Sequence, residues 1–197
     1  RSLGGAFVFM HKTVQEFFVA AGLRQSLLAG GLAARPDGLR GLVYASSSSV
    51  YGANRDLPYA VEQATDSPVS FYGATKKAGE ILVQSYAHLY GVPCTGLRFF
   101  TVYGPWGRPD MALFRFVESI LKDEPIQVFG GGEQTRDFTY IDDIVEGVLR
   151  TLDTPATGDG NWDPSAPNLA TSAAPWRVFN IGGGRPIPLL QFIACIE

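Results

Sequence analysis

A tyrosine and a lysine four residues apart are the residues of this sequence best suited to proton transfer. Tyr72 and Lys76 fall in a stretch of helical periodicity, so both side chains are expected on one face of a helix. A nearby ammonium group favours the phenolate form of a tyrosine, and a phenolate can take a proton from an alcohol. The spacing alone is weak evidence, because a solvent-exposed pair of these common residues has the same pattern.

A run of serines supplies further hydroxyl groups. Residues 46–49 are all serine and directly follow an apolar segment, residues 42–45, that is expected to be a buried strand. Open α/β sheets bind ligands at the carboxyl ends of their strands, where these hydroxyls would emerge. A polar turn explains the serines alone equally well, so their value lies in the combination with Tyr72 and Lys76.

The elements that must position these groups alternate along the chain. Short apolar runs alternate with longer segments of helical period, which is typical of βαβ units and a mainly parallel sheet. We expect strands over residues 42–45, 95–100, 126–129 and 178–181, and helices over residues 13–28, 71–90, 112–122 and 142–152. Asp142 is the expected N-cap of the last helix, and residues 154–175 are expected to form a polar surface loop.

Composition excludes several classes of function. The 197 residues carry a net charge of −3, which leaves no excess of basic side chains for a nucleic-acid partner. The two cysteines, Cys94 and Cys195, form neither a disulfide framework nor a metal-ligand spacing, so no metal site is predicted. The apolar runs are too short to span a bilayer. We expect a soluble protein in a reducing compartment, with no nucleic-acid or membrane partner.

Five motifs together resemble one known family. In chain order they are YASSSSVYG (44–52), YGATK (72–76), GLRFFTVYGPWGRPDMA (96–112), RDFTYIDDIVEG (136–147) and RVFNIG (177–182). They resemble the NAD-dependent epimerase/dehydratase family of extended short-chain dehydrogenases/reductases, and are most similar to UDP-glucuronate 4-epimerases. The resemblance implies an α/β fold, a partial Rossmann-type doubly wound parallel sheet with a small C-terminal substrate-binding region. Residues 1–107 would belong to the NAD-binding domain, and residues 108–197 mainly to the substrate-binding region, with segments that return to the sheet.

The resemblance also implies a catalytic set and a mechanism. Ser47, Tyr72 and Lys76 would be catalytic, with Ser48 or Ser49 as alternatives to Ser47 after a small register error. Tyr72 would take the proton of the sugar 4-hydroxyl while hydride leaves C4 for NAD, and the rotated 4-ketone would take the hydride back on its other face. The cofactor contacts implied in this way are Ser46, Tyr72, Lys76, Phe99 and Val102.

The substrate contacts come from the same resemblance. Thr101 and Arg108 would meet the C5 substituent of the sugar, where an arginine fork suits the carboxylate of a uronic acid. Arg136 would reach the diphosphate. Ser48 and Ser49 also belong to the implied substrate contacts, and the uracil contacts would be Met111, Ala112, Val128 and Phe129. A solvated loop arginine at position 108 and a core strand at residues 128–129 are the alternative interpretations.

The serines also bear on the type of reaction. Related 4,6-dehydratases carry an Asp-Glu pair directly before the Val-Tyr-Gly motif, where this chain has Ser48 and Ser49. Hydroxyl groups replace carboxyl groups poorly as the acid and base of a dehydration, whereas epimerisation needs neither carboxyl group. The serines therefore favour a 4-epimerase. The resemblance at Thr101 and Arg108 implies UDP-glucuronate as its substrate, and a UDP-glucose/galactose 4-epimerase is the alternative.

The glycine motif that binds the NAD pyrophosphate in this family is not found in the sequence. We therefore expect the N-terminal glycine-motif units to be missing. Two hypotheses follow: a piece of an active epimerase, or a truncated inactive chain that only binds a nucleotide sugar or a homologous subunit. The resemblance further implies a homodimer in the cytoplasm, acting in nucleotide-sugar metabolism and polysaccharide biosynthesis.

Overall fold

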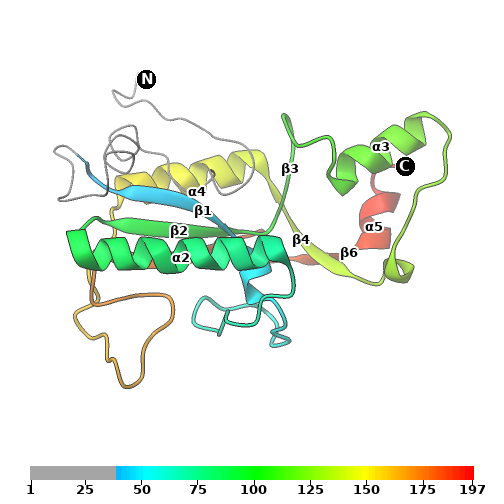
Figure 1. Ribbon diagram of the computed structural model, residues 1–197. Coiled ribbons are helices and arrows are strands. Elements are labelled where there is room, and N and C mark those ends of the chain that lie inside the picture. Colours follow the sequence, from blue (N-terminus) through cyan, green and yellow to red (C-terminus); the bar gives the residue numbers. More distant parts are fainter. Residues whose placement is uncertain (1–38) are drawn as a thin grey trace. The chain divides into compact units, whose positions relative to one another are not determined.

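The computed structural model describes residues 39–197, drawn in colour in Figure 1. The helix predicted over residues 13–28 lies outside this range. Two compact units can be distinguished within it. The first contains the described residues up to Arg98 together with Val148–Asn180, and the second contains Phe99–Gly147 together with Ile181–Glu197. None of the helices in the described range is both long enough and apolar enough to cross a membrane.

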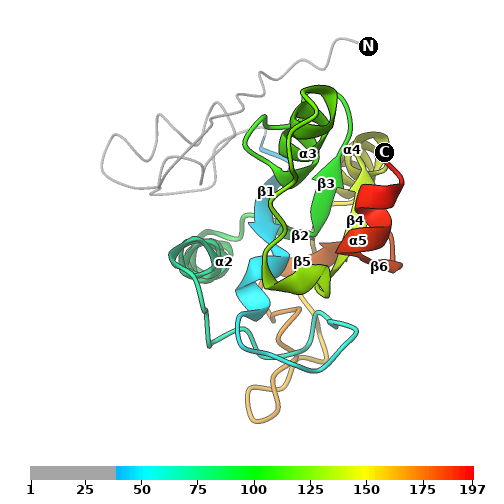
Figure 2. The same cartoon turned by 90° about the vertical axis from the view of Figure 1, so that its right-hand side faces the viewer.

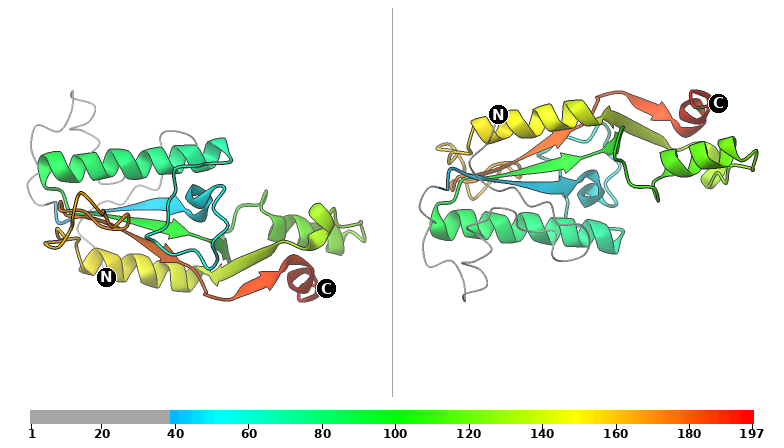
Figure 3. Two further views of the ribbon diagram at one scale, coloured as in Figure 1. Left: turned by 90° about the horizontal axis from the view of Figure 1, so that it is seen from below. Right: turned by 90° about the horizontal axis from the view of Figure 1, so that it is seen from above.

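The first unit is built on a three-stranded sheet with the strand order β1-β2-β5. Its strands are β1 (Leu42–Ser47), β2 (Cys94–Phe99) and β5 (Trp176–Ile181), and their arrows point the same way in Figure 3. The carboxyl ends of the strands therefore share one edge of the sheet. Helix α2 (Phe71–Tyr90) connects β1 to β2 and lies along one side of this sheet (Figure 2). This is the parallel α/β arrangement that the sequence predicts.

Helix α2 has clear signals at both ends. The hydroxyl of Ser70 accepts the amide hydrogen of Gly73 at 3.0 Å, which caps the first turn. Gly91 has the left-handed φ of 63° that ends many helices, because glycine adopts this conformation without steric cost. Between these caps one face of the helix is buried against the sheet. The core of the unit comprises Leu42, Tyr44, Val83, Ala87, Val92, Cys94, Ala170, Ala174, Trp176 and Val178.

The second unit has a small mixed sheet with the order β3-β4-β6. Strand β3 (Thr101–Tyr103) runs parallel to β4 (Thr135–Tyr140), and β6 (Pro186–Pro188) runs antiparallel to β4. Helices α3 (Ala112–Leu121) and α5 (Leu189–Ala194) bury Phe116, Leu189 and Ile193 in a second core cluster. Helix α4 (Ile141–Asp153) contributes residues to both units.

Two predictions about elements are wrong. Residues 126–129 do not form a strand. Ile126 and Val128 are apolar because they pack against the cluster around Phe116, and the three glycines that follow turn the chain with positive φ angles. Asp142 is not an N-cap, because α4 already begins at Ile141 and places this carboxylate inside its first turn. A negative charge there still complements the helix dipole.

The other predicted elements within residues 39–197 are confirmed. The strands at 42–45, 95–100 and 178–181 and the helices at 71–90, 112–122 and 142–152 correspond to β1, β2, β5, α2, α3 and α4. The segment 154–175 contains neither a helix nor an extended strand, and one isolated bridge joins Thr171 to Arg177. It is only in part the predicted surface loop, because Ala170 and Ala174 are small apolar residues that pack into the core of the first unit. The division of ligand-binding roles at residue 107 remains a prediction.

Candidate functional site

Strand β1 delivers the serines to the carboxyl edge of the first sheet. Ser47 ends β1 and caps the short 3-10 helix η2 (Ser48–Tyr51), accepting the amide hydrogen of Ser49 on its Oγ at 3.2 Å. The side chains of Val50 and Tyr51 are fully buried and anchor this turn. Ser47 is itself buried, and Ser48 and Ser49 are partly buried. The serine predicted as catalytic is therefore held at a defined place in the turn.

Helix α2 presents Tyr72 and Lys76 on one face, as the spacing predicts. The Nζ atom of Lys76 lies 5.6 Å from the centroid of the Tyr72 ring and donates a hydrogen bond to the Ala45 carbonyl at 3.3 Å. Lys76 is only 8% exposed, whereas Tyr72 is 49% exposed. A buried ammonium thus lies beside an accessible phenol and is hydrogen-bonded to the strand that leads into the serines.

Gly73 brings the first turn of α2 close to the serine turn. A Cβ atom at this position would lie 2.6 Å from the Ser49 carbonyl oxygen, so only glycine allows this approach. The sequence analysis did not identify Gly73 as a functional residue. The available signal was a glycine in the first turn of a helix, directly after the tyrosine. Gly73 therefore lets the first turn of α2, which includes Tyr72, approach the serine turn at Ser49.

A buried ion pair between Arg98 and Glu80 was also not predicted from the sequence. Arg98 on β2 donates from Nε to Oε1 of Glu80 at 2.9 Å and from Nη2 to Oε2 at 3.0 Å. Glu80 also accepts the hydroxyl of Ser46 on Oε1 at 2.6 Å. Burial alone lowers the pKa of the Arg98 guanidinium, but the hydrogen bond and charge of Glu80 outweigh burial and raise this pKa. Ser46, a predicted cofactor contact, thus points its hydroxyl at Glu80.

The predicted carboxylate receptor lies in the second unit. Thr101 and Val102 are partly buried in β3, and Thr101 is paired with Phe138 of β4. Arg108 is exposed in the turn before α3 and makes a two-pronged ion pair with Asp110, with Nε to Oδ1 at 3.0 Å and Nη2 to Oδ2 at 2.5 Å. The guanidinium therefore already binds a carboxylate, in the fork geometry expected for a uronic acid.

The predicted uracil contacts also belong to the second unit. Met111 is the N-cap residue of α3 and is 40% exposed, and Ala112 is the first residue of that helix. Val128 packs against the core cluster of this unit, whereas the neighbouring Phe129 is 64% exposed. Phe99, a predicted cofactor contact, ends β2 and is partly buried. Of the two residues expected to bracket the base, only Phe129 therefore offers a largely exposed side chain.

Strand β4 presents the predicted diphosphate contact. Arg136 is exposed, and its Nη1 donates to the Thr135 carbonyl at 2.8 Å. The carboxylate of the next residue, Asp137, accepts the amide hydrogens of Gly183 and Gly184 at 2.7 and 2.8 Å. Asp137 thus holds the glycine turn that leads into β6. The catalytic candidates Ser47, Tyr72 and Lys76 lie in the first unit, whereas the base, diphosphate and carboxylate contacts lie in the second.

Comparison with known proteins identifies the family. Residues 26–169 match the model of the "NAD dependent epimerase/dehydratase family". The chain is 50% identical over 157 residues to a probable UDP-glucuronate 4-epimerase of Rhizobium meliloti, covering 79% of this chain and 46% of that protein. It is 51% identical over 161 residues to UDP-glucuronate 4-epimerase 2 of Arabidopsis thaliana, covering 79% of this chain and 36% of that protein.

Solved structures lead to the same family. The structure of UDP-glucuronic acid 4-epimerase from Bacillus cereus, in complex with UDP-glucuronic acid and NAD, matches with a TM-score of 0.61 and 38% sequence identity. The match covers 79% of this chain and 44% of that structure. The chain spans less than half the length of these relatives. The family model, the relatives and the parallel α/β fold with its Tyr-Lys pair show that the chain belongs to the NAD-dependent epimerase/dehydratase family.

Proposed function

We propose that this chain carries the catalytic residues of an NAD-dependent UDP-sugar 4-epimerase whose substrate is UDP-glucuronate and whose product is UDP-galacturonate. The observation that carries the proposal is the position of the buried Lys76 ammonium. It lies beside the Tyr72 ring and donates a hydrogen bond to the Ala45 carbonyl of β1, the strand that ends at Ser47. Relatives and solved structures that are named as UDP-glucuronate 4-epimerases support the choice of reaction and sugar.

The residues at the edge of the first sheet fit the reactive end of NAD. An accessible phenol, a buried ammonium and a capped serine turn gather where parallel strands end, which is where dinucleotides bind in such sheets. When bound, NAD supplies removal and return of hydride at the sugar C4. The proposed contacts with NAD are Ser46, Tyr72, Lys76, Phe99 and Val102.

Each residue of the proposed catalytic set has a distinct task. The Tyr72 phenolate takes the proton of the 4-hydroxyl, and the charge of Lys76 stabilises that phenolate. The Oγ of Ser47 already accepts the Ser49 amide hydrogen, so its own proton is the one to donate to the reacting oxygen. Ser48 or Ser49 takes this role if the register differs by one or two residues.

Arg108 is the proposed receptor of the sugar carboxylate, with Thr101 beside it in the sequence motif. Its two-pronged pair with Asp110 supports this proposal, because the guanidinium holds a carboxylate in the required geometry. The same pair favours a second candidate, a UDP-glucose/galactose 4-epimerase, if Asp110 keeps the guanidinium and the sugar never displaces it. Arg136 is the proposed diphosphate contact, and Met111, Ala112, Val128 and Phe129 are the proposed uracil contacts.

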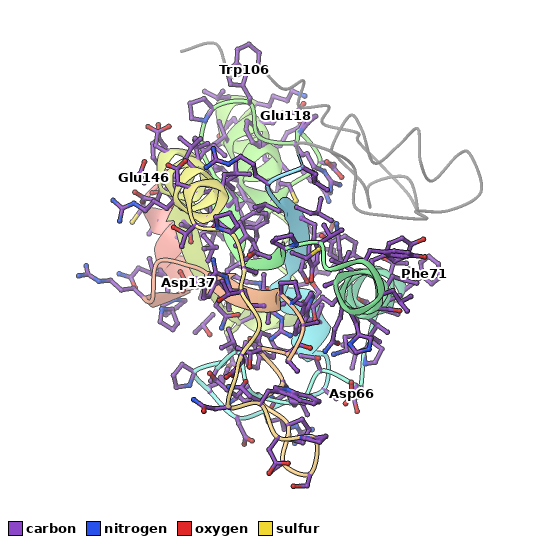
Figure 4. All side chains as sticks on the ribbon, turned by 90° about the vertical axis from the view of Figure 1, so that its left-hand side faces the viewer. Asp66, Phe71, Trp106, Glu118, Asp137 and Glu146 are labelled. Carbon is purple, nitrogen blue, oxygen red and sulfur yellow. The ribbon has the colours of Figure 1, made fainter. Side chains whose placement is uncertain are left out.

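The proposal extends to assembly and setting. Large apolar side chains are exposed along α2, including Phe71, Ile81, Leu82 and Leu89, and Figure 4 shows Phe71 pointing away from the unit. Such a face supports a homodimer formed through this helix. A cytoplasmic role in polysaccharide biosynthesis rests on the resemblance to the family alone.

Sugar selectivity tests the proposal. In calorimetric titrations with NAD present, Arg108→Met is expected to weaken UDP-glucuronate binding about 10- to 150-fold, because a charged hydrogen-bonded pair contributes about 1.5–3 kcal/mol. UDP-glucose binding should be unchanged. The matched control is Arg115→Met, which removes an exposed arginine of α3 and should affect neither ligand. Equal loss for both sugars would contradict the carboxylate assignment. No loss for either sugar would favour the hexose epimerase, in which Asp110 keeps the guanidinium. Failure of the unmodified chain to bind either ligand would overturn the proposed function for this chain.

A further inference from the structure

The ion pair between Arg98 and Glu80 is the most deeply buried charged group of the first unit. The two side chains are 1% and 2% exposed, and they meet through two parallel hydrogen bonds. Removing two charges from water is costly, and well-packed apolar side chains of similar volume often stabilise a fold as well or better. Fold stability alone is therefore a weak reason for placing this pair in the core.

The pair joins every element that carries a proposed catalytic residue. Glu80 accepts the hydroxyl of Ser46 at 2.6 Å, which ties α2 to β1. Arg98 donates from Nη1 to the Tyr51 hydroxyl at 3.1 Å and to the Val61 carbonyl at 3.1 Å. The Tyr51 hydroxyl in turn donates to Oδ1 of Asn180 on β5 at 2.7 Å. A single guanidinium thus connects β1, η2, α2, β2 and, through Tyr51, β5.

The partners of the pair are neighbours of the groups that do chemistry. Glu80 follows Lys76 by four residues on α2, so it lies one turn further along the same face. Ser46 directly precedes Ser47, and Tyr51 ends the 3-10 helix that Ser47 caps. The network therefore holds the Tyr72–Lys76 face on one side and the turn containing Ser47 on the other.

We propose that Glu80 and Arg98 are positioning residues that fix the serine turn of β1 against the Tyr72–Lys76 face of α2. The inference rests on the proposed function, which needs the Ser47 hydroxyl and the Tyr72 phenol at one reacting oxygen. A misplacement of about 1 Å lowers a rate by about a hundredfold. Two parallel hydrogen bonds fix the guanidinium more tightly than apolar packing can, and this explains a buried pair that stability alone does not require.

The decisive variant is the double substitution Glu80→Met with Arg98→Met. It removes both charges together and fills a similar volume, so the chain should melt within a few degrees of the unmodified protein. Ser46→Ala is the milder variant, since it removes only the hydrogen bond that joins β1 to Glu80. Lys77→Met is the matched control, because Lys77 lies on the same helix and pairs with Asp66 at 3.5 Å outside the network.

The first readout is amide hydrogen exchange of the chain without ligands. Ser49 donates its amide hydrogen to Ser47 Oγ, and Gly91 donates its amide hydrogen to the Ala87 carbonyl at the far end of α2. In the double variant and in Ser46→Ala we expect exchange at Ser49 to accelerate at least about tenfold while exchange at Gly91 stays unchanged. A purely structural role would change both sites together or neither.

The second readout is turnover of UDP-glucuronate with NAD. The double variant should lower kcat about a hundredfold with little change in the KM of the UDP-sugar, because the proposed contacts with its base, diphosphate and carboxylate lie in the second unit. Unchanged exchange at Ser49 would overturn the positioning role, and so would an unchanged kcat in a folded double variant. If the double variant does not fold, Ser46→Ala decides by the exchange readout. If the unmodified chain shows no turnover, the proposed function fails, and exchange at Ser49 still tests the positioning role.

Discussion

Two arginines of this chain bind carboxylates in the same fork geometry but in opposite surroundings. Arg98 and Glu80 are almost completely buried, whereas the side chains of Arg108 and Asp110 are 48% and 58% exposed. The partner of Arg98 lies on another element, 18 residues away, and the partner of Arg108 lies two residues away. Burial and distance in sequence make the first pair a fixed part of the core. Because the second pair is exposed, water, salt ions or another carboxylate can replace Asp110 as the partner of Arg108.

The largest effect expected from this comparison concerns stability. Arg98→Met should lower the free energy of unfolding by about 3–5 kcal/mol, because it leaves the Glu80 carboxylate buried without its partner charge. Arg108→Met should change it by no more than about 0.5 kcal/mol, since exposed pairs contribute little. Urea unfolding of both variants measures the difference. Equal losses would show that the two pairs do not differ as their burial indicates.

Two glycines sharpen the comparison between packed and open surroundings. Gly73→Ala should destabilise by about 1–3 kcal/mol, because its Cβ would lie 2.6 Å from the backbone oxygen of Ser49. Gly147→Ala is the matched control in another helix, where the nearest atom would be a side-chain carbon of Ile181 at 3.4 Å. There we expect a gain of about 0.4–1 kcal/mol from the lower entropy of the unfolded chain. A neutral Gly73→Ala variant would show that α2 does not approach the serine turn this closely.

A smaller effect concerns the buried thiol of Cys94, the first residue of β2. Burial raises the pKa of Cys94 from 9.0 to about 12, so the unfolded chain loses this proton at lower pH than the folded protein. The stabilisation is complete below pH 9 and is lost as pH rises toward 12. When the pH is raised from 8 to 10, the free energy of unfolding of the unmodified chain should fall by about 1 kcal/mol more than that of Cys94→Ala. Equal losses in chemical denaturation at the two pH values would contradict the burial of this thiol.

The comparison also shows what sequence can and cannot predict. The residues of α2 follow a helical period between a serine cap and a glycine stop, so this helix and the shared face of Tyr72 and Lys76 were predictable. Strand β4 is as long as β1 and β2, but it was missed because its sequence TRDFTY lacks the apolar run of a buried strand and its sheet partners come from distant segments. Residues 126–129 were mistaken for a strand because apolar residues that pack against helices have the same composition as a short buried strand.

The placement of the candidate site residues was predictable to a similar degree, while their roles stay predictions. Spacing and resemblance led to Ser47, Tyr72 and Lys76, which β1 and α2 place on adjoining elements of one unit. The pair of Glu80 and Arg98 was not predictable, because a glutamate on a helix and an arginine in a strand suggest solvent contact. Their pairing depends on the packing of α2 against the sheet, which no local pattern encodes.

Tyr72 is the proposed proton acceptor of a UDP-sugar 4-epimerase, and the proposed function depends on this role. The most direct test follows conversion of UDP-glucuronate to UDP-galacturonate by proton NMR, with NAD present, in the unmodified chain, in Tyr72→Phe and in the control Tyr86→Phe. We expect conversion by the unmodified chain and by Tyr86→Phe, and a rate at least about a hundredfold lower for Tyr72→Phe, because general base catalysis typically contributes about 10²–10⁴-fold. Full activity of Tyr72→Phe, or no conversion by the unmodified chain, would contradict the proposed function.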